Sequence, residues 1–382
     1  MRFKKIMTLA LAGALSASAF ALTGCGGEKK LWQYYEDYFK IGCTMNYGTQ
    51  AQYDDIAGEF NSMTCENEMK WEALEPTEGD FTFTVADDMV AFAKEHGMAV
   101  RGHCLAWHNP LSLPSWVFVE GEGAEATTAS FEKIKERLVN HATAVVEHFG
   151  SDVYAWDVWN EMLTDSYTTD ETDLYRIDSG WHNICGLNGD ETPEEREAAN
   201  EKIEELIVAT FAAAREAAPA DTKLFYNEYL TNNTYKVEKL LTMLDRLLEK
   251  GCEIDGVGIQ CHYDINNFDS EMLDYVIKEI GKRGLEVQIT EYDFSMYHYN
   301  NDTTLFYDEF TEDMSALQAS CVGKLFEVCR NNKDIVTAVV QWGVADDDSY
   351  LFNMPVEGRQ DWPYIFDAEH QKKEAYYAII DF

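Results

Sequence analysis

The sequence predicts a single-domain α/β fold, in which eight parallel strands alternate with helices and close into a (β/α)8 TIM barrel. The chain of 382 residues is long enough for one large domain and too short for two such domains. Eight short apolar runs alternate with longer helical patterns, as parallel crossover connections require. Polar side chains follow each run, at the end where barrels of this kind carry their active sites.

The candidate strands are short apolar runs between turn signals. They cover Ile41–Asn46, Ser62–Glu66, Ala99–Leu105, Val153–Asn160, Lys223–Asn227, Gly256–His262, Glu286–Thr290 and Val336–Trp342. Helical patterns cover Val85–His96, Phe131–Phe149, Glu194–Ala217, Tyr235–Lys250, Ser270–Lys282, Thr304–Asn332 and Gln371–Ile380. Short helices are expected at Lys29–Lys40 and near Gln52–Phe60. A doubly wound open sheet is the alternative fold, but no glycine-rich phosphate turn follows the first strand.

The first 24 residues have the composition of a targeting signal. A basic start, Met1–Lys5, precedes the apolar stretch Ile6–Phe20, which is too short for an ordinary membrane-spanning helix. The tetrad Leu22-Thr23-Gly24-Cys25 resembles the lipobox of bacterial lipoproteins. That resemblance implies cleavage before Cys25, a lipid on its thiol, and a location on the outer face of the cell membrane. Ordinary secretion is the alternative.

Charge and cysteine content exclude several classes of protein. Asp and Glu number 69 against 30 Lys and Arg, and the formal charge of −39 argues against nucleic acid as a partner. Apart from Cys25, the eight cysteines lie largely in apolar runs, where a thiol behaves as a small hydrophobic group, so we expect free buried thiols. No Cys-x-x-Cys pair is present, which disfavours a structural zinc site.

Two glutamates end two of the predicted strands. Glu161 follows Val153–Asn160, and Glu291 follows Glu286–Thr290. A charged group at the end of an apolar strand is costly to bury unless it is paired or used. Two carboxyl groups facing each other across a barrel suit glycoside hydrolysis, in which one donates a proton to the leaving oxygen and the other attacks the anomeric carbon.

Several stretches then resemble the motifs of glycoside hydrolase family 10, the xylanases. Glu66-Asn67-Glu68-Met69-Lys70-Trp71 resembles E-N-x-M-K-W, and Gly102-His103-Cys104-Leu105-Ala106-Trp107-His108 resembles G-H-x-L-x-W-H. Further along, Trp156-Asp157-Val158-Trp159-Asn160-Glu161 resembles W-D-V-x-N-E, Ile289-Thr290-Glu291-Tyr292-Asp293 resembles I-T-E-x-D, and Trp342-Gly343-Val344 resembles W-G-[VI]. The resemblance extends from about Ile41 to Phe382, which marks residues 41–382 as the catalytic domain, behind a signal peptide (1–24) and a lipid-attachment site with a short helix (25–40).

The family resemblance implies retaining endo-hydrolysis of β-1,4-xylosidic linkages in xylan through a covalent glycosyl-enzyme. Glu161 would be the acid/base and Glu291 the nucleophile. The mechanism requires no metal and no organic cofactor. We expect a monomer with xylan or xylo-oligosaccharides as substrate, no nucleic acid, and contact with a membrane only through Cys25.

The resemblance also assigns substrate-binding residues. Asn160 would bind the 2-hydroxyl of the sugar under attack, and His262, supported by Asp293, would orient Glu291. The other substrate-binding residues would line the sugar site. They are Glu66, Asn67, Lys70, His103 and Trp107 on the glycone side, Asn227 and Gln260 in a polar ring, Trp342 under the sugar, and Tyr350.

Some positions depart from the family pattern or admit another interpretation. Tyr350 stands where the family commonly has a Trp that closes the glycone side, which bears on sugar specificity. The loop Leu163–Gly189 is long and acidic, and it is a candidate for reshaping the leaving-group side. Asp157 is interpreted as a buried supporting group.

The alternatives in function are a related barrel glycosidase acting on β-1,4-glucan and a non-catalytic sugar-binding lipoprotein. The latter class predicts two open-sheet lobes.

Overall fold

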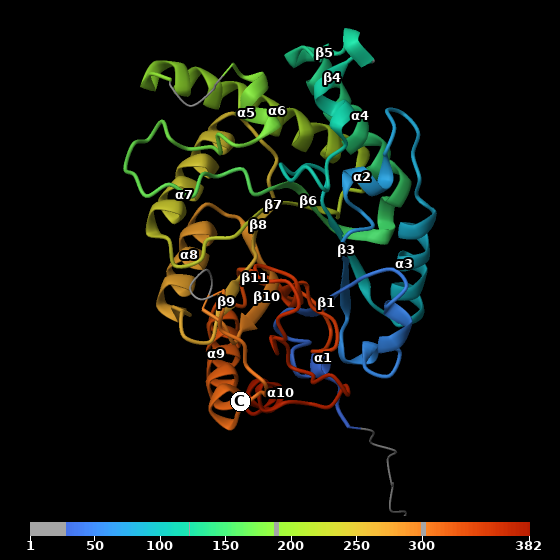
Figure 1. Cartoon of the computed structure of the whole chain (residues 1–382), viewed down its shortest axis with the longest axis vertical. Helices are drawn as coiled ribbons and strands as arrows, with labels where there is room; N and C mark the ends of the chain where they lie inside the picture. The colour runs from blue at the N-terminus through green and yellow to red at the C-terminus, as the bar shows by residue number, and fades with distance from the viewer. Residues whose placement is uncertain (1–27, 122, 187–190, 299–302) are drawn as a thin grey trace, which may run out of the picture.

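The computed structural model describes residues 28–121, 123–186, 191–298 and 303–382, so the tetrad Leu22–Cys25 lies outside the described residues. Within these ranges, eight parallel strands form the barrel, in the order β11-β1-β2-β3-β6-β7-β8-β10, and a pairing between β10 and β11 closes it (Figure 1). The strands are β1 Lys40–Met45, β2 Ser62–Cys65, β3 Ala99–His103, β6 Val153–Asn160, β7 Lys223–Glu228, β8 Gly256–Ile259, β10 Glu286–Ser295 and β11 Val336–Gln341. The predicted TIM barrel is confirmed.

Helices cover the outside of this ring of strands (Figure 1). The longer ones are α3 Thr84–Glu95, α4 Phe131–Phe149, α6 Pro193–Ala217, α7 Thr234–Glu249, α8 Ser270–Lys282 and α9 Glu312–Asn331. Shorter ones are α1 Leu31–Tyr34, α2 Trp71–Leu74, α5 Gly180–Ile184 and α10 Glu374–Ile380. Each long helix turns an apolar stripe toward the strands, so the core lies between the two layers.

Several predicted boundaries were wrong. The helix expected over Lys29–Lys40 ends at Tyr34, and the segment near Gln52–Phe60 forms two short 3-10 helices, Gln50–Tyr53 and Ala57–Glu59. The helix expected from Thr304 begins at Glu312, because the Thr311 side chain accepts the Met314 N–H and caps the first turn. The last helix begins at Glu374 rather than Gln371.

The strand predicted over Gly256–His262 is interrupted. It divides into β8, which ends at Ile259, and β9 His262–Asp264, which pairs in parallel with β10. Between them, Cys261 has φ 63°, in the left-handed region that breaks a strand. This break directs the Gln260 and His262 side chains separately into the site described below. A small antiparallel pair, β4 Val119–Glu120 and β5 Thr127–Thr128, was not predicted.

The two ends of the described chain meet at the N-terminal end of the barrel, opposite the strand ends that carry the polar residues. The Tyr35 hydroxyl donates to the Ile379 carbonyl oxygen, and its ring lies 5.2 Å from that of Phe382. Buried Glu59 accepts from the Leu31 N–H at 2.7 Å and from the Tyr376 hydroxyl at 2.8 Å. The segment before β1 is therefore fixed to the last helix.

The described residues contain no candidate for a structural cross-link or metal. The eight cysteines of the barrel are buried free thiols: Cys43, Cys65, Cys104, Cys185, Cys252, Cys261, Cys321 and Cys329. In the same ranges, no three His, Cys, Asp or Glu side chains are arranged to hold a metal ion. Every helix found there is too short or too polar to cross a membrane.

Candidate active site

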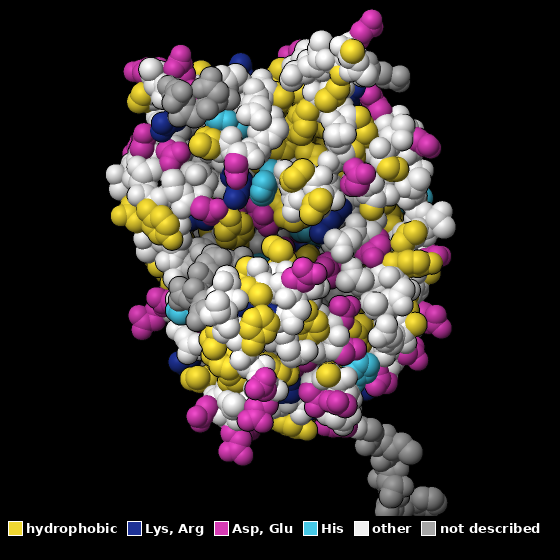
Figure 2. Space-filling model, viewed as in Figure 1, with side chains coloured by type: hydrophobic (Ala, Val, Ile, Leu, Met, Phe, Trp, Pro, Cys, Tyr) yellow, Lys and Arg dark blue, Asp and Glu magenta, His cyan; other side chains and the backbone are white. Residues whose placement is uncertain are grey.

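The C-terminal ends of the strands bring the two predicted glutamates into one hydrogen-bonded network. The space-filling view is hollowed over the middle of the ring of strands, with charged and histidine side chains at the border (Figure 2). Asn227 of β7 donates to Glu291 Oε1 at 2.6 Å and to Asn160 Oδ1 at 2.9 Å. Gln260 donates to the same Asn160 oxygen at 3.3 Å and to Glu161 Oε1 at 2.8 Å. Two amide side chains and Asn160 thus join the carboxylates.

Glu291 is buried and surrounded by donors. Besides Asn227, His262 Nε2 lies 3.1 Å from Glu291 Oε2. Burial by itself raises the pKa of Glu291, but the hydrogen bond from His262 and the nearby His103 outweigh it and hold that pKa below its ordinary value. Glu291 is therefore ionised at neutral pH.

His262 is held between two carboxylates. Its Nδ1 lies 2.7 Å from Asp293 Oδ2, on the side opposite Glu291. Burial lowers the pKa of His262, but Asp293 and Glu291 together raise it to about 10. The imidazole is therefore a cation at neutral pH, and it donates from both ring nitrogens. The structure thus places Asp293 against His262, the residue that it was expected to support.

Glu161 has different surroundings and is partly open to solvent. Trp107 Nε1 donates to its Oε2 at 2.9 Å, and Gln260 donates to the other oxygen. Both oxygens accept from neutral donors, whereas Glu291 faces an imidazolium. The two carboxyl groups therefore share one network in unlike electrostatic settings, which suits unlike roles.

On the β1–β2 side, a second group of predicted residues forms a connected chain. Lys70 Nζ donates to Asn67 Oδ1 at 2.9 Å and lies 5.0 Å from the Trp107 ring centre. Asn67 donates to Asn46 Oδ1 at 3.0 Å, and Asn46 donates to Glu66 Oε2 at 2.6 Å. Burial raises the pKa of Glu66, although Asn46 and Lys70 oppose that shift. These side chains extend the site from Trp107 toward β1.

His103, Trp342 and Tyr350 border the same space. His103 packs edge-on against Trp342 with 5.3 Å between ring centres, and Trp342 lies 6.3 Å from His262. The Tyr350 hydroxyl donates to Asp293 Oδ2 at 3.1 Å. Every predicted site residue of the barrel therefore lies in one connected region, and Cys25 lies outside the described residues.

Sequence reasoning missed several residues that hold the site in place. Thr290 Oγ1 donates to Asn227 Oδ1 at 2.7 Å and so orients the amide. Gly258 leaves room for it, because a Cβ there would lie 2.1 Å from Asn227 Oδ1. Arg101 forms a two-pronged ion pair with buried Asp157. Arg101 is a charged residue within an apolar strand, and that signal was available in the sequence.

Asp157, interpreted from the sequence as a buried supporting group, is fully buried. It accepts from His103 Nδ1 at 2.8 Å besides Arg101. Burial by itself raises the pKa of Asp157, but Arg101 and His103 outweigh it and hold that pKa below its ordinary value. The ion pair lies inside the barrel and is joined to the strand-end network through His103.

The long loop after β6 is fixed to β7 and α7, which the sequence did not reveal. Arg176 Nη1 donates to the Tyr229 hydroxyl at 3.0 Å, and that hydroxyl donates to Asp165 Oδ2 at 2.6 Å. Lys236 Nζ lies 2.8 Å from Asp165 and 3.0 Å from Glu228. These contacts place a cationic and aromatic cluster beside Glu161, on the side expected for the leaving group.

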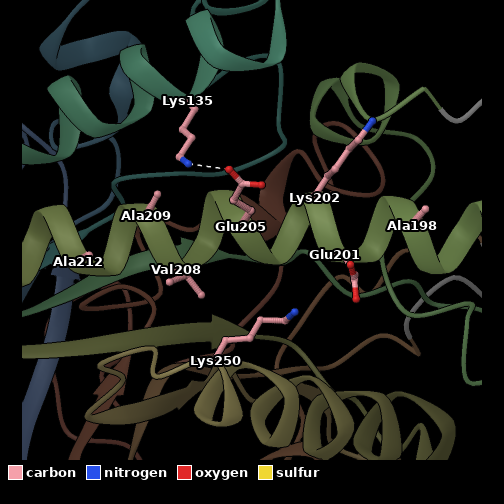
Figure 3. A pocket seen from close by; sticks show the side chains of 9 residues that line it. All are labelled: Lys135, Ala198, Glu201, Lys202, Glu205, Val208, Ala209, Ala212 and Lys250. Atoms are coloured by element: carbon pink, nitrogen blue, oxygen red, sulfur yellow. Dashed lines mark hydrogen bonds and ion pairs between the residues drawn. The ribbon is translucent and has the colours of Figure 1, made fainter.

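Another groove, of about 680 Å³, lies on the outer helical layer along α6 (Figure 3). Its lysines are engaged by protein groups: Lys135 by Glu205 at 2.6 Å, and Lys250 by Glu204 at 3.3 Å. It has no aromatic lining and none of the residues of the network above. The strand-end network is therefore the candidate active site.

Comparison with known proteins agrees with this geometry. The profile of Glycosyl hydrolase family 10 matches residues 30–382. The chain is 37% identical to a β-1,4-xylanase of Dictyoglomus thermophilum over 353 residues, covering 92% of this chain and 90% of that protein. It is also similar to the crystal structure of an endo-1,4-β-xylanase from Caldicellulosiruptor owensensis, with TM-score 0.80, 37% identity, and coverage of 92% and 99%. A mutant solved in complex with xylotriose matches with TM-score 0.81, 35% identity, and coverage of 93% and 100%. The chain therefore belongs to glycosyl hydrolase family 10.

Proposed function

We propose that this protein is a retaining endo-β-1,4-xylanase that cleaves xylan through a covalent glycosyl-enzyme intermediate. One observation carries the proposal: two carboxyl groups share a hydrogen-bonded network at the strand ends, and only Glu291 faces an imidazolium. Retaining glycosidases need such a pair, one member ionised for attack and the other able to exchange a proton. The xylanase names of the relatives support xylan as the substrate.

In the first step, a Glu291 oxygen attacks the anomeric carbon while the bond from that carbon to the leaving oxygen breaks. Glu161 gives its proton to the leaving oxygen. In the second step, Glu161 takes a proton from water, the water oxygen bonds to the anomeric carbon, and Glu291 is released as a carboxylate. The two steps balance without a metal or an external oxidant.

Asn160 serves the same transition state. Its Oδ1 already accepts from Asn227 and Gln260, which fixes the orientation of the amide. The Nδ2 donor is then the part of Asn160 that meets the 2-hydroxyl of the sugar. Hydrogen bonds to that hydroxyl strengthen as positive charge develops on the ring, so Asn160 favours the transition state over the bound substrate.

The glycone side is formed by the chain that extends from Trp107 to β1. Glu66, Asn67 and Lys70 present charged and amide groups to sugar hydroxyls, while His103, Trp342 and Tyr350 enclose the ring. A β-1,4-glucan carries an extra 6-hydroxymethyl group on each sugar and remains the alternative substrate. Tyr350, which replaces an expected Trp, is a specific reason to test it.

The experiment measures sugar release from xylan and from soluble β-glucan by the wild-type protein, Glu291→Ala and Glu161→Gln. We expect xylan cleavage by the wild type and a loss of at least about 10²-fold in kcat for each variant, because each removes a group that acts in the transition state. Glu72→Gln is the matched control, since Glu72 is exposed on α2, and its activity should be unchanged.

Azide distinguishes the two roles. In Glu291→Ala it occupies the place of the lost nucleophile and should give a glycosyl azide of inverted configuration.

Cleavage of β-glucan alone by the wild type would keep the mechanism and replace the substrate. No cleavage of either polymer by the wild type would overturn the proposal.

We also infer that the mature protein is a monomer that begins at Cys25 and is anchored by a lipid on that cysteine to the outer face of the cell membrane. The sequence Leu22-Thr23-Gly24-Cys25 after a basic start and an apolar stretch supports cleavage before Cys25 and the lipid anchor. Secretion without a lipid is the alternative.

A further inference from the structure

Tyr350 reaches the groups behind the candidate nucleophile. It lies in the segment after β11, at the start of the 3-10 helix Tyr350–Phe352. Its hydroxyl donates to Asp293 Oδ2 at 3.1 Å and lies 3.2 Å from His262 Nδ1. Its ring stands edge-on to the His262 ring, with centres 5.7 Å apart. This one side chain therefore connects the β11 segment to β9 and β10.

The shared acceptor is a single buried carboxylate oxygen. Asp293 Oδ2 accepts from His262 Nδ1 at 2.7 Å as well as from Tyr350. A carboxylate oxygen has two lone pairs, so the two donors fill its near positions and fix its direction. Asp293 is 1% exposed, so water does not substitute readily for a lost donor. The orientation of the His262 ring thus depends on a carboxylate that Tyr350 helps to hold.

We propose that Tyr350 is a positioning residue for the nucleophile, acting from its hydroxyl through Asp293 and His262 on Glu291. This inference rests on the proposed function and adds a role that the family resemblance does not give to this position. The expected Trp would offer only a ring N–H as a donor, at a different place on the side chain. The phenol in this chain therefore changes the chemistry of the site as well as its shape.

The electrostatic setting makes this donor matter. Other charged groups face the same residues from neighbouring elements: Asp361 faces Asp293, while His103, Asp157 and Arg101 face Glu291. Two carboxylates, Glu291 and Asp293, share the one imidazolium of His262. These three buried side chains together therefore carry a net negative charge. Each hydrogen bond donated to these carboxylates favours the ionised form. Removing the Tyr350 hydroxyl therefore makes it easier for the set of Glu291, His262 and Asp293 to take up a proton.

The test is the pH dependence of kcat/KM for Tyr350→Phe, which keeps the ring and removes the hydroxyl. The acidic limb reports protonation of the free enzyme. We expect it to move to higher pH by about 0.5–1 unit, the size expected for one hydrogen bond to a charged group. KM should stay within about twofold, because the ring still borders the sugar site. Tyr350→Trp should show the same displaced limb.

Tyr53→Phe is the matched control. The Tyr53 hydroxyl donates to Asp347 at 3.2 Å, so this variant removes another tyrosine–aspartate hydrogen bond in the same part of the molecule. It does not touch Asp293 or His262, and its acidic limb should match that of the wild type. A limb displaced equally in both variants would attribute the effect to the β11 segment in general and overturn the proposal.

A second readout separates this inference from the proposed function. The titration of the His262 ring, followed by NMR of ¹⁵N-labelled histidine, needs no substrate, and it should move upward in Tyr350→Phe because Asp293 has lost a competing donor. An unchanged His262 titration, or a raised KM with an unmoved acidic limb, would overturn the role of Tyr350. Failure of the wild type to cleave xylan would instead overturn the proposed function.

Discussion

The backbone at Glu161 lies in the left-handed region, with φ 58°. For a residue other than glycine, that conformation costs on the order of 1–3 kcal/mol and persists only where neighbouring contacts fix it. Here the contacts are made by three successive backbone N–H groups, those of residues 161–163, which donate to acceptors on β7. Glu161 donates to the Asn227 carbonyl at 3.0 Å, Met162 to the Tyr226 hydroxyl at 3.0 Å, and Leu163 to Glu228 Oε2 at 3.2 Å. The direction of the Glu161 side chain is thus set by the fold before any sugar binds.

His262 makes a prediction about stability at alkaline pH. Burial lowers the pKa of its ring, but Asp293 and Glu291 raise it to about 10 in the folded protein. In the unfolded chain it is near the ordinary value of about 6.5. Between these values the folded state binds more protons, so its stability falls as pH rises, by at most about 1.4 kcal/mol per pH unit. The contribution is fully present below about pH 6.5.

The measurement is the free energy of unfolding in urea at pH 6, 8 and 10, for the wild type and His262→Asn. The wild type should lose more stability than the variant across this range, because other titrating groups are common to both proteins. Parallel losses in the two proteins would show that His262 is not charged in the folded state.

At this scale, residue types were easier to predict than their partners. Glu161 and Glu291 were identified because a carboxylate at the end of an apolar strand needs a reason to be there. Thr290 gave no such signal, since a Thr in a strand is ordinary, and Asn46 was noticed only as one of the polar residues that end the predicted strands. Their importance comes from pairing with Asn227 and Glu66, which are far away in the sequence. Those pairings depend on which strand ends the barrel brings together.

A buried ion pair connects three strands inside the barrel. Arg101 of β3 pairs with Asp157 of β6, and Arg101 Nε donates to Gln288 of β10 at 2.8 Å. Arg101 and Asp157 are fully buried. A buried pair is costly to form, but breaking it leaves an uncompensated charge, which costs more.

Arg101→Met should therefore lower the free energy of unfolding by about 3–5 kcal/mol. The double variant Arg101→Met/Asp157→Leu should lose clearly less than the sum of the single losses, because neither charge is left alone. Urea unfolding at pH 7 measures the three values. Additive losses would show that the two charges are stabilised independently of each other.

Strand starts were predicted to within one residue, but β10 continues to Ser295, five residues beyond its predicted end, and the last two helices begin later than predicted. β6 has the bounds that an apolar run between turn signals predicts, Val153–Asn160. The start of α9 was misplaced by eight residues, from Thr304 to Glu312, because Thr311 caps the helix through one side-chain hydrogen bond. The break at Cys261 was also invisible, since nothing in an apolar run marks a left-handed residue.

For the whole molecule, the predicted lipid makes localisation testable. In cells, the wild type should fractionate with membranes and incorporate a labelled fatty acid. Cys25→Ser should appear in the soluble fraction or remain unprocessed, because the thiol that carries the lipid is gone. Xylan cleavage by the purified Cys25→Ser protein should equal that of the wild type, since the barrel is unchanged. A wild-type protein that is found in the soluble fraction and carries no labelled fatty acid would favour ordinary secretion.

The meeting of the two chain ends at the N-terminal end of the barrel has a consequence for such an anchored enzyme. Five residues, Gly26–Lys30, separate Cys25 from α1, and a fully extended chain of that length spans at most about 18 Å. The end of the barrel that holds both chain ends would then lie near the bilayer, and the strand ends that carry the candidate active site are at the opposite end. A reporter domain fused to Phe382 would lie in the narrow space beneath the barrel, so short and long fusion linkers should differ sharply in how well they preserve anchoring.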